Sequence, residues 1–238
     1  MKRGLVLIPV FLVVLFLIFI SGFSGKGTGT PGDPYQITNC TELQEINDNL
    51  SASYILTNKI DCSDTAKWND GAGFLPIGDP SGSGFTGVLD GQNYEITNLY
   101  INRAQLSCGL FSFVAGGSIS NINLNNESVL CTGSTYVGGL VGFVNGGSIT
   151  NVSTSGEVGG GIVDSAIDSY GNTGVGGVIG RNLFVSVGKT SSTAKVTGTE
   201  NVGGLIGKNY GDITESFASG TVTGKDSGST GALVGLYG

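Results

Sequence analysis

The amino-acid sequence predicts an all-β fold, namely a parallel β-helix (a solenoid) with a short N-terminal capping helix, and three observations lead there. Glycine accounts for 43 of the 238 residues, without the three-residue period of collagen. A six-residue glycine motif recurs along the C-terminal half of the chain. Valine, isoleucine, threonine and asparagine fill the stretches between glycines, which is typical of short strands joined by tight turns.

The first residues are expected to lie outside the folded part. A short basic start, Met1-Lys2-Arg3, precedes an apolar run at residues 5–20 and small residues up to Ser24. This pattern is typical of a secretory signal peptide. Residues 1–24 are therefore predicted to be a signal peptide or, if they are not cleaved, an N-terminal membrane anchor. Both outcomes predict an exported protein.

Residues 25–101 are predicted to form an N-terminal cap and the first coils of the solenoid. The Thr-x-x-Gln pattern at Thr41–Gln44 resembles a capping box, and apolar residues from Leu43 to Leu50 follow at helical spacing. A short helix here would close the N-terminal end of the solenoid, which otherwise exposes an unpaired strand edge. After the helix we expect one strand at residues 54–61.

Residues 102–238 are predicted to form the repeated coils. The motif Val-Gly-Gly-Leu-Val-Gly starts at Val137, and close variants start at Val175, Val202 and Thr230. A unit this short cannot bury its own apolar side, so successive units must stack. We expect the aliphatic residue at the fourth position of each copy to form a column inside the stack. These residues are Leu140, Val178, Leu205 and Leu233.

Two further elements recur downstream of the glycine motif, so that each repeat is predicted to contain three short strands in register. One is an Ile-x-Asn pattern that ends at Asn98, Asn121 and Asn151, and the other contains Val158 or Val196. An asparagine amide at a corner can bond to the corner backbone and to the asparagine of the next coil. We therefore expect these three asparagines to stack in one inward-facing ladder.

Taken together, the motifs resemble those of GLUG-motif repeat proteins. They are the opening Gly-Thr-x-x-x-Pro-Tyr-x-Ile, the Leu-Thr-Asn-x-Ile-Asp strand, Pro-Ile-Gly and the iterated Gly-Gly-Leu-Val-Gly. Members of that group are bacterial and archaeal surface proteins, adhesin-like or found beside immunoglobulin-A-cleaving metallopeptidase domains. The resemblance covers residues 25–238 and implies that the β-helix is right-handed and lies at the cell surface. It implies no catalysis, and it offers no catalytic residue to carry over.

Composition excludes several classes of function. The chain has no histidine, which excludes imidazole-activated nucleophiles, HExxH zinc proteases and histidine metal sites. Its formal net charge is −7, and nucleic-acid binding needs clustered cations, so no nucleic-acid partner is expected. Dinucleotide-like glycine patterns at Gly27 and Gly82 lack the required strand, turn and helix. We expect no catalytic residue, cofactor or metal ligand, and membrane contact only through an uncleaved N-terminal segment.

The candidate binding loop is an insertion that contains acidic residues. One repeat is about ten residues longer than its neighbours, and insertions in solenoids become loops on one face, where binding often occurs. The extra residues of this repeat include Asp164, Asp168 and Tyr170, which are the candidate binding residues. The alternative is that the insertion is a difference in length without a function. Asp61 and Asp64 are interpreted as solvated turn residues, against the alternative of a glycosidase or calcium pair.

Four cysteines in an exported chain favour disulfides over metal or redox chemistry. Three pairings can be drawn. Because Cys40 and Cys62, and likewise Cys108 and Cys131, lie about one coil apart, we predict these two pairs.

Sequons of the type Asn-x-Ser/Thr add candidate glycosylation sites. Asn126 is the preferred acceptor, and Asn39 and Asn49 are further candidates. The sequon at Asn151 is set aside because that residue is expected to lie in the inward ladder.

These observations predict a non-enzymatic protein, secreted or at the cell surface, whose β-helix serves as a stalk or an adhesive surface. The expected partner is a surface glycan or protein. The last repeat stops at Gly238, so two expectations stay open: the chain is a fragment truncated at the C-terminus, or its uncapped final coil is covered by another molecule, as in end-to-end association of copies. Two alternatives stay open: a carbohydrate-active β-helix enzyme (polysaccharide lyase or hydrolase) and an ice-binding face of ranked threonines.

Overall fold

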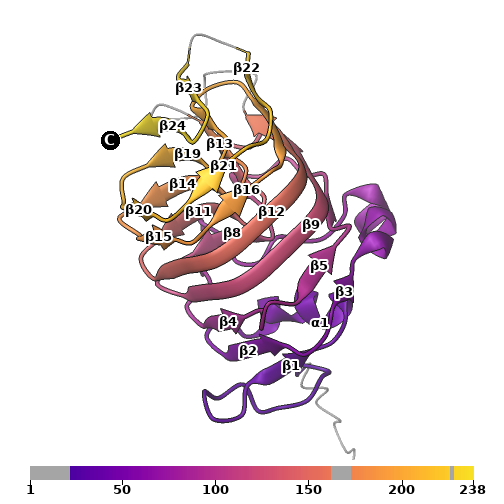
Figure 1. The fold of residues 1–238 in the computed structure, drawn as a ribbon. Helices are drawn as coiled ribbons and strands as arrows, with labels where there is room; N and C mark the ends of the chain where they lie inside the picture. Colours follow the sequence, from indigo (N-terminus) through magenta and orange to yellow (C-terminus); the bar gives the residue numbers. More distant parts are fainter. Residues whose placement is uncertain (1–21, 162–172, 226–227) are drawn as a thin grey trace, which may run out of the picture.

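The computed structural model describes residues 22–161, 173–225 and 228–238. In this part of the chain the fold is all-β, as predicted, with parallel strands in three sheets and a short α-helix near the N-terminus (Figure 1). Residues 1–21 of the predicted signal segment lie outside the described residues, and so do Asp164, Asp168 and Tyr170 of the candidate binding loop. None of the helices in the described ranges is long and apolar enough to cross a membrane.

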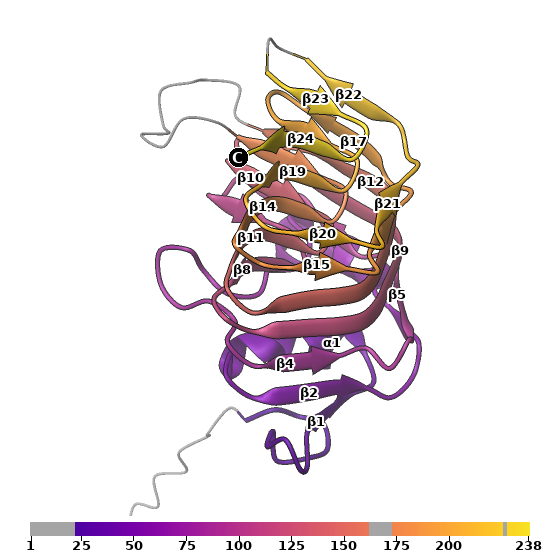
Figure 2. The ribbon, with the colours of Figure 1, turned by 60° about the vertical axis from the view of Figure 1, so that its left-hand side comes forward.

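The chain runs through the three sheets in a repeating order. The large sheet has 14 strands, and two small sheets have 5 strands each. From β7 to β22, each coil supplies one strand to the first small sheet, one to the second small sheet and then a passage through the large sheet, and β23 and β24 add one more strand to each small sheet. Figure 2 shows these passages stacked on one another along the molecule. Every pairing between these strands is parallel and joins one coil to the next.

The bounds of the elements are as follows. The large sheet consists of β1 (Tyr35–Ile37), β2 (Ser53–Leu56), β3 (Ile60–Asp61), β4 (Val88–Asp90), β5 (Glu95–Thr97), β6 (Tyr100–Ile101), β9 (Ser118–Thr132), β12 (Ser148–Gly161), β15 (Val187–Gly188), β16 (Ser191–Ser192), β17 (Lys195–Gly198), β20 (Ile213–Thr214), β21 (Phe217–Ala218) and β22 (Val222–Gly224). The first small sheet consists of β7 (Ser107–Cys108), β10 (Tyr136–Gly138), β13 (Gly174–Gly176), β18 (Val202–Gly203) and β23 (Thr230–Gly231). The second small sheet consists of β8 (Phe111–Val114), β11 (Val141–Asn145), β14 (Ile179–Leu183), β19 (Ile206–Asn209) and β24 (Val234–Tyr237). The helical segments are α1 (Cys40–Gln44), η1 (Glu45–Asp48), η2 (Ser63–Lys67) and η3 (Asn69–Gly71).

The glycine motif is a corner between the two small sheets, not a single strand. β10 ends at Gly138 and β11 begins at Val141, so the motif spans both strands. Glycine is required because the backbones of successive coils approach closely there. A Cβ atom at Gly180 would lie 2.5 Å from the Val137 nitrogen and 2.6 Å from the Gly142 oxygen. The motif therefore recurs wherever one coil turns against its neighbour.

The predicted aliphatic column fills the interior of these corners. Leu140, Val178 and Leu205 are fully buried, and Leu233 in the last coil is partly buried. The Leu140 N–H donates to the Val178 carbonyl at 3.0 Å, and the Val178 N–H donates to the Leu205 carbonyl at 2.9 Å. Stacked side chains inside and backbone hydrogen bonds alongside thus join each coil to the next, which confirms the predicted stacking.

The two downstream elements stack in register, but they belong to one strand in β9 and β12. Ile149 pairs with Ile119, and Val158 pairs with Val129. Separate strands were expected for the two elements. The strand continues because a left-handed residue, Asn121 with a φ of 56°, bends its backbone without ending the ladder of hydrogen bonds.

The helix begins earlier than the sequence pattern predicted, so the proposed Thr41 capping box is wrong. Asn39 is the N-cap, and its Oδ1 accepts a hydrogen bond from the Glu42 N–H at 3.0 Å. The Glu42 carboxylate in turn accepts from both the N–H and the hydroxyl of Thr38. Asparagine at the cap satisfies an orphan N–H of the first turn, which leaves Thr41 inside the helix.

Two further expectations for the N-terminal region are corrected. β1, rather than the helix, is the end strand of the large sheet, and α1 with η1 lies in sequence between β1 and β2, where later coils have small-sheet strands. The single strand expected at 54–61 is divided into β2 and β3. The division falls at Asn58, whose amide donates to the Thr38 and Lys59 carbonyls and so forms a turn.

Both disulfides have the pairing that the sequence predicted. Cys40 is bonded to Cys62 with the Cα atoms 5.3 Å apart, and Cys108 is bonded to Cys131 with the Cα atoms 6.4 Å apart. The first joins the start of α1 to the residue after β3. The second joins a small-sheet strand to the end of β9 and so ties the two ends of one coil together.

Replacing a member of the buried column tests how much the stacking stabilises the fold. Leu140→Ala is expected to lower the free energy of unfolding by about 2–5 kcal/mol, because it leaves a cavity in a close-packed interior. Urea denaturation measures this. The matched variant Leu106→Ala, at a side chain that is 49% exposed, is expected to change stability by less than about 1 kcal/mol. Equal losses in the two variants would contradict the stacking model.

Candidate functional site

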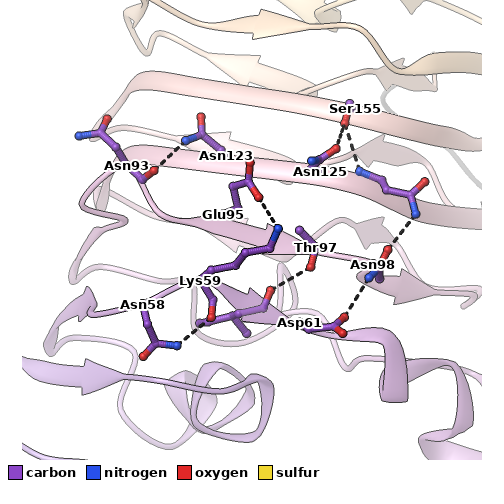
Figure 3. A network of polar contacts seen from close by, with 12 residues as sticks. Asn58, Lys59, Asp61, Asn93, Glu95, Thr97, Asn98, Asn123, Asn125 and Ser155 are labelled. Carbon is purple, nitrogen blue, oxygen red and sulfur yellow. Dashed lines mark hydrogen bonds and ion pairs between the residues drawn. The ribbon is translucent and has the colours of Figure 1, made fainter.

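Asparagine side chains on the exposed face of the large sheet form two columns, not the single inward ladder that was predicted. In the first column the Asn121 side-chain amide donates to the Asp90 carboxylate at 2.8 Å, and the Asn151 side-chain amide donates to Oδ1 of Asn121 at 2.7 Å. In the second column Asn98 donates to the Asp61 carboxylate at 2.9 Å (Figure 3).

Asn98 belongs to the second column because of the strand register. Ile96 of β5 pairs with Leu124 of β9, so Asn98 stacks on Asn126, whose amide donates to it at 2.8 Å. The sequence alignment had placed Asn98 with Asn121. The columns also face outward, since Asn126 is exposed.

Left-handed backbone explains why asparagine occupies these positions. Asn98, Asn121, Asn126 and Asn151 have φ values between 55° and 59°. Asparagine tolerates this conformation better than most residues do, because its short amide can bond locally. Each column therefore marks a bend of the large sheet at which the chain changes direction.

The remaining polar groups of this face also bond to neighbouring coils. Lys59 pairs with Glu95 at 2.6 Å, and Lys195 pairs with Glu157 at 2.9 Å. The hydroxyl of Ser155 donates to Asn125 at 2.9 Å (Figure 3). Because these donors and acceptors are largely used between coils, the polar groups of this face help to hold the coils together.

The two carboxylates once considered as a catalytic or calcium pair have separate partners. The hydrogen bond from Asn98, together with one from the Ser63 N–H at 3.0 Å, lowers the pKa of the exposed Asp61 carboxyl. Asp64 forms an exposed ion pair with Lys67 at 2.9 Å. Within the described residues no cluster of three or more acidic or cysteine side chains could hold a metal ion.

The candidate glycosylation sites are exposed, but their amides already make hydrogen bonds. Asn126 uses its amide nitrogen, the atom that a glycan would occupy, to bond Asn98. Asn39 caps α1, and the Asn49 side chain accepts hydrogen bonds from Ser51. Glycosylation at these residues stays a prediction.

The two arginines beyond the signal segment have structural roles. Arg103 donates to the Gly73 and Phe74 carbonyls, both at 3.0 Å, and burial lowers the pKa of its guanidinium. Arg181 donates to the Tyr136 hydroxyl at 2.7 Å and lies over that ring at 5.2 Å from its centre. Arg181 also pairs in register with Lys208 of the next coil, and both cations lie over the Tyr210 ring.

Sequence reasoning missed the most unusual group in the interior, Glu127. Its side chain is 2% exposed, and no hydrogen bond reaches either carboxyl oxygen among the described residues. Burial raises the pKa of this carboxyl well above its ordinary value of 4.5. The sequence signal was weak: alternation counted back from Val129 turns Glu127 inward, but alternation counted from Leu124 does not, because the register of β9 shifts by one residue between them.

Two substitutions at Asn121 distinguish what the side-chain hydrogen bonds of a column contribute to stability from what the left-handed backbone conformation contributes. Asn121→Gly removes both side-chain hydrogen bonds but tolerates the φ of 56°, whereas Asn121→Ala adds left-handed strain of about 1 kcal/mol. We expect thermal stability to fall in the order wild type, Asn121→Gly, Asn121→Ala. The reverse order of the two variants would show that backbone conformation is not what selects asparagine.

Glu127 is expected to make stability depend on pH. Below about pH 4.5 the carboxyl is protonated in both states. Above it the unfolded chain releases the proton while the folded protein keeps it, so stability falls as pH rises toward the folded pKa, by up to about 1.4 kcal/mol per pH unit.

The isosteric Glu127→Gln variant removes this titration and is therefore expected to gain stability over wild type progressively from pH 4 to pH 8. Urea denaturation at several pH values measures the gain. The control Glu95→Gln replaces an exposed, ion-paired carboxylate and is expected to show no such gain. Parallel stability curves for wild type and Glu127→Gln would contradict the role of burial.

Comparisons with known proteins agree with the motifs and the fold. A family model described as the GLUG motif matches residues 198–223, which run from the end of β17 into β22. A crystal structure from Bacteroides ovatus, provisionally assigned as an immunoglobulin A1 protease, superposes with a TM-score of 0.69. That match has 22% sequence identity and covers 90% of this chain and 64% of the other, so it supports the fold alone.

Two relatives share longer stretches of sequence. Halomucin from Haloquadratum walsbyi is 44% identical over 118 residues, which are 47% of this chain and 1% of halomucin. A protein from Evansella cellulosilytica, provisionally named a Gly-rich membrane protein, is 29% identical over 145 residues, 56% of this chain and 17% of that protein. The chain thus spans a small part of the length of both relatives. The resemblance to GLUG-motif repeat surface proteins is confirmed, with a GLUG motif at residues 198–223.

Proposed function

We propose that this chain is an exported, non-enzymatic surface protein whose repeats form a closed, right-handed parallel β-helix that serves as a rigid structural or adhesive element. The register of the repeats carries the proposal, since each coil is bonded to the next along all three sheets. Solenoids distribute their stability along their length in this way, which suits a stalk or spacer.

The order of the strands supports the proposed closure and handedness. The chain leaves the large sheet, crosses both small sheets and returns to the large sheet as a parallel strand. Crossovers between parallel strands of one sheet are right-handed in about 98% of cases. The Cys108 to Cys131 bond supports closure, because it links a small sheet to the far end of β9 in the same coil.

Surface location is supported by the relatives and by the sequence. One relative is named halomucin and the other is named a membrane protein, and we place this chain at the cell surface by likeness to them. The N-terminal apolar segment provides a route of export, and the paired cysteines suit an oxidising environment. The acidic net charge of −7 favours solubility outside the cell.

The outer face of the large sheet supports a structural role over a catalytic one. Its amides and carboxylates bond from coil to coil, as in Asp61, Asn98 and Asn126, instead of converging on a reacting centre. Glycoside hydrolysis needs two carboxyl groups facing each other across a bond. We therefore keep adhesion to a glycan or protein as the proposed interaction.

Two assays test export and the absence of polysaccharide-cleaving activity. Cells that produce the full chain are treated with an external protease and fractionated. We expect the full chain to be degraded at the surface, or found in the medium, and a variant lacking residues 2–24 to stay inside. The purified chain is also incubated with a panel of polysaccharides, with and without calcium, and no new reducing or unsaturated ends are expected. Intracellular full chain would overturn the location, and product release would favour the carbohydrate-active enzyme.

A further inference from the structure

A two-lobed groove lies beside the N-terminal helix, where the fold departs from regular coils. One lobe, of about 530 Å³, is lined by α1, η1 and Trp68. The other, of about 550 Å³, is lined by the loop after Leu75 and by Leu106. Asn47 and Leu75 line both lobes, so the two lobes are adjacent.

The walls of this groove are fixed by hydrogen bonds. Gln44 of α1 donates to the Leu75 carbonyl and accepts from the Leu75 N–H, both at 2.8 Å. The Asn47 side chain accepts from the Gly78 N–H at 3.0 Å. Arg103 holds the Phe74 carbonyl from the other side at 3.0 Å. The groove is therefore formed before any ligand arrives, which lowers the entropic cost of binding.

The Cys40 to Cys62 disulfide joins the two sides of the first lobe. Cys40 opens α1, and Cys62 precedes η2, the short helix that leads to Trp68. The indole ring stacks on the buried Phe74 ring with 6.2 Å between centres and also lines the groove. Trp68 is thus a supported aromatic wall rather than a mobile surface side chain.

The chemistry of the lining disfavours an anionic ligand. Leu75 and Leu106 are 46% and 49% exposed, and hydroxyl and amide groups of serine, threonine, asparagine and glutamine residues surround them. Among the described residues that line either lobe there is no lysine or arginine, whereas Glu45, Asp48 and Asp79 are present. An anionic ligand would meet repulsion there.

An unused donor lies between the lobes. The Nδ2 atom of Asn47 is buried and has no hydrogen-bond partner within the described part of the chain, while the bond from Gly78 identifies the other amide atom as the oxygen. Unpaired buried donors are rare, so this one favours a ligand that brings an acceptor oxygen. Sugars combine such oxygens with apolar C–H faces that pack on aromatic and aliphatic side chains.

We propose that the groove binds a neutral glycan, with one sugar ring packed on Trp68 and the chain continuing over Leu75 toward Leu106. This deepens the proposed adhesive function, on which it rests, by naming the class of ligand and the place where it binds. It assigns recognition to the irregular N-terminal region rather than to the repeated coils.

Trp68 is the only tryptophan, so its fluorescence reports directly on the site. The full chain is titrated with neutral oligomers of glucose, mannose, galactose and N-acetylglucosamine, with sulfated and uronic-acid oligosaccharides, and with oligolysine. Calorimetry follows the same titrations. We expect a saturable change in emission with at least one neutral oligomer and none with the anionic ones. Binding of anionic oligosaccharides or oligolysine alone, or no binding of any probe, overturns the inference.

Variants localise the binding. Trp68→Ala is expected to weaken it about tenfold or more, as truncation of a central aromatic anchor does. Leu106→Asp changes an exposed side chain at the other end and is expected to weaken it without altering circular dichroism or thermal stability, which keeps the test valid if Trp68→Ala folds poorly. Tyr94→Ala, at an exposed aromatic residue outside the groove lining, is the control. Unchanged affinity in both groove variants overturns the site.

The failure of this inference can be distinguished from that of the proposed function. If the protein is at the surface, has no enzymatic activity and binds no glycan, the proposed structural role is retained and the proposed glycan site in the groove is refuted. If the protein is intracellular, or if it releases polysaccharide fragments, the proposed function itself is refuted, whatever the groove binds.

Discussion

Backbone hydrogen bonds between successive coils, made along all three sheets and beside glycine corners where the coils approach closely, hold the repeats of this protein in register. A single coil has unpaired N–H and C=O groups on both sides and too little apolar surface to fold by itself. Stacking pairs those groups and builds the Leu140, Val178 and Leu205 column at the same time. A slip of one residue would turn the inward side chains of a strand to solvent, so the register decides the core as well as the hydrogen bonds.

The same register determines the surface. Because equivalent residues lie directly above one another, a polar residue that suits one coil can bond its own counterpart in the next, as Asn151 does with Asn121. The large sheet is therefore covered by polar groups that mostly satisfy each other. Glu127 is the interior exception, and its raised pKa reflects the free energy required to keep a carboxyl group away from water.

Regular coils leave little room for a ligand, and the groove lies where regularity ends. Between β1 and β4 the chain forms α1, η1, η2 and η3 instead of small-sheet strands. Those segments need their own supports, which are a disulfide and side chains such as Gln44 and Arg103 that bond to backbone. The division resembles that of many proteins in which a rigid scaffold positions irregular segments for recognition.

The sequence by itself determined the all-β class, the repeat, the inward column and the pairing of the cysteines, because each depends on spacing along the chain. It could not assign Asn98 to its column. Asparagine suits both left-handed bends of a coil, which in β9 lie at Asn121 and Asn126. Only the pairing of Ile96 with Leu124 shows that Asn98 stacks on Asn126. It likewise gave no sign of the groove, since Gln44, Trp68 and Leu106 are distant in sequence and meet only when the first coils are packed. Local backbone conformation and side-chain burial determine which residues suit corners and strands. The pairing of strands in the tertiary structure determines which corners stack on one another and which side chains share a surface.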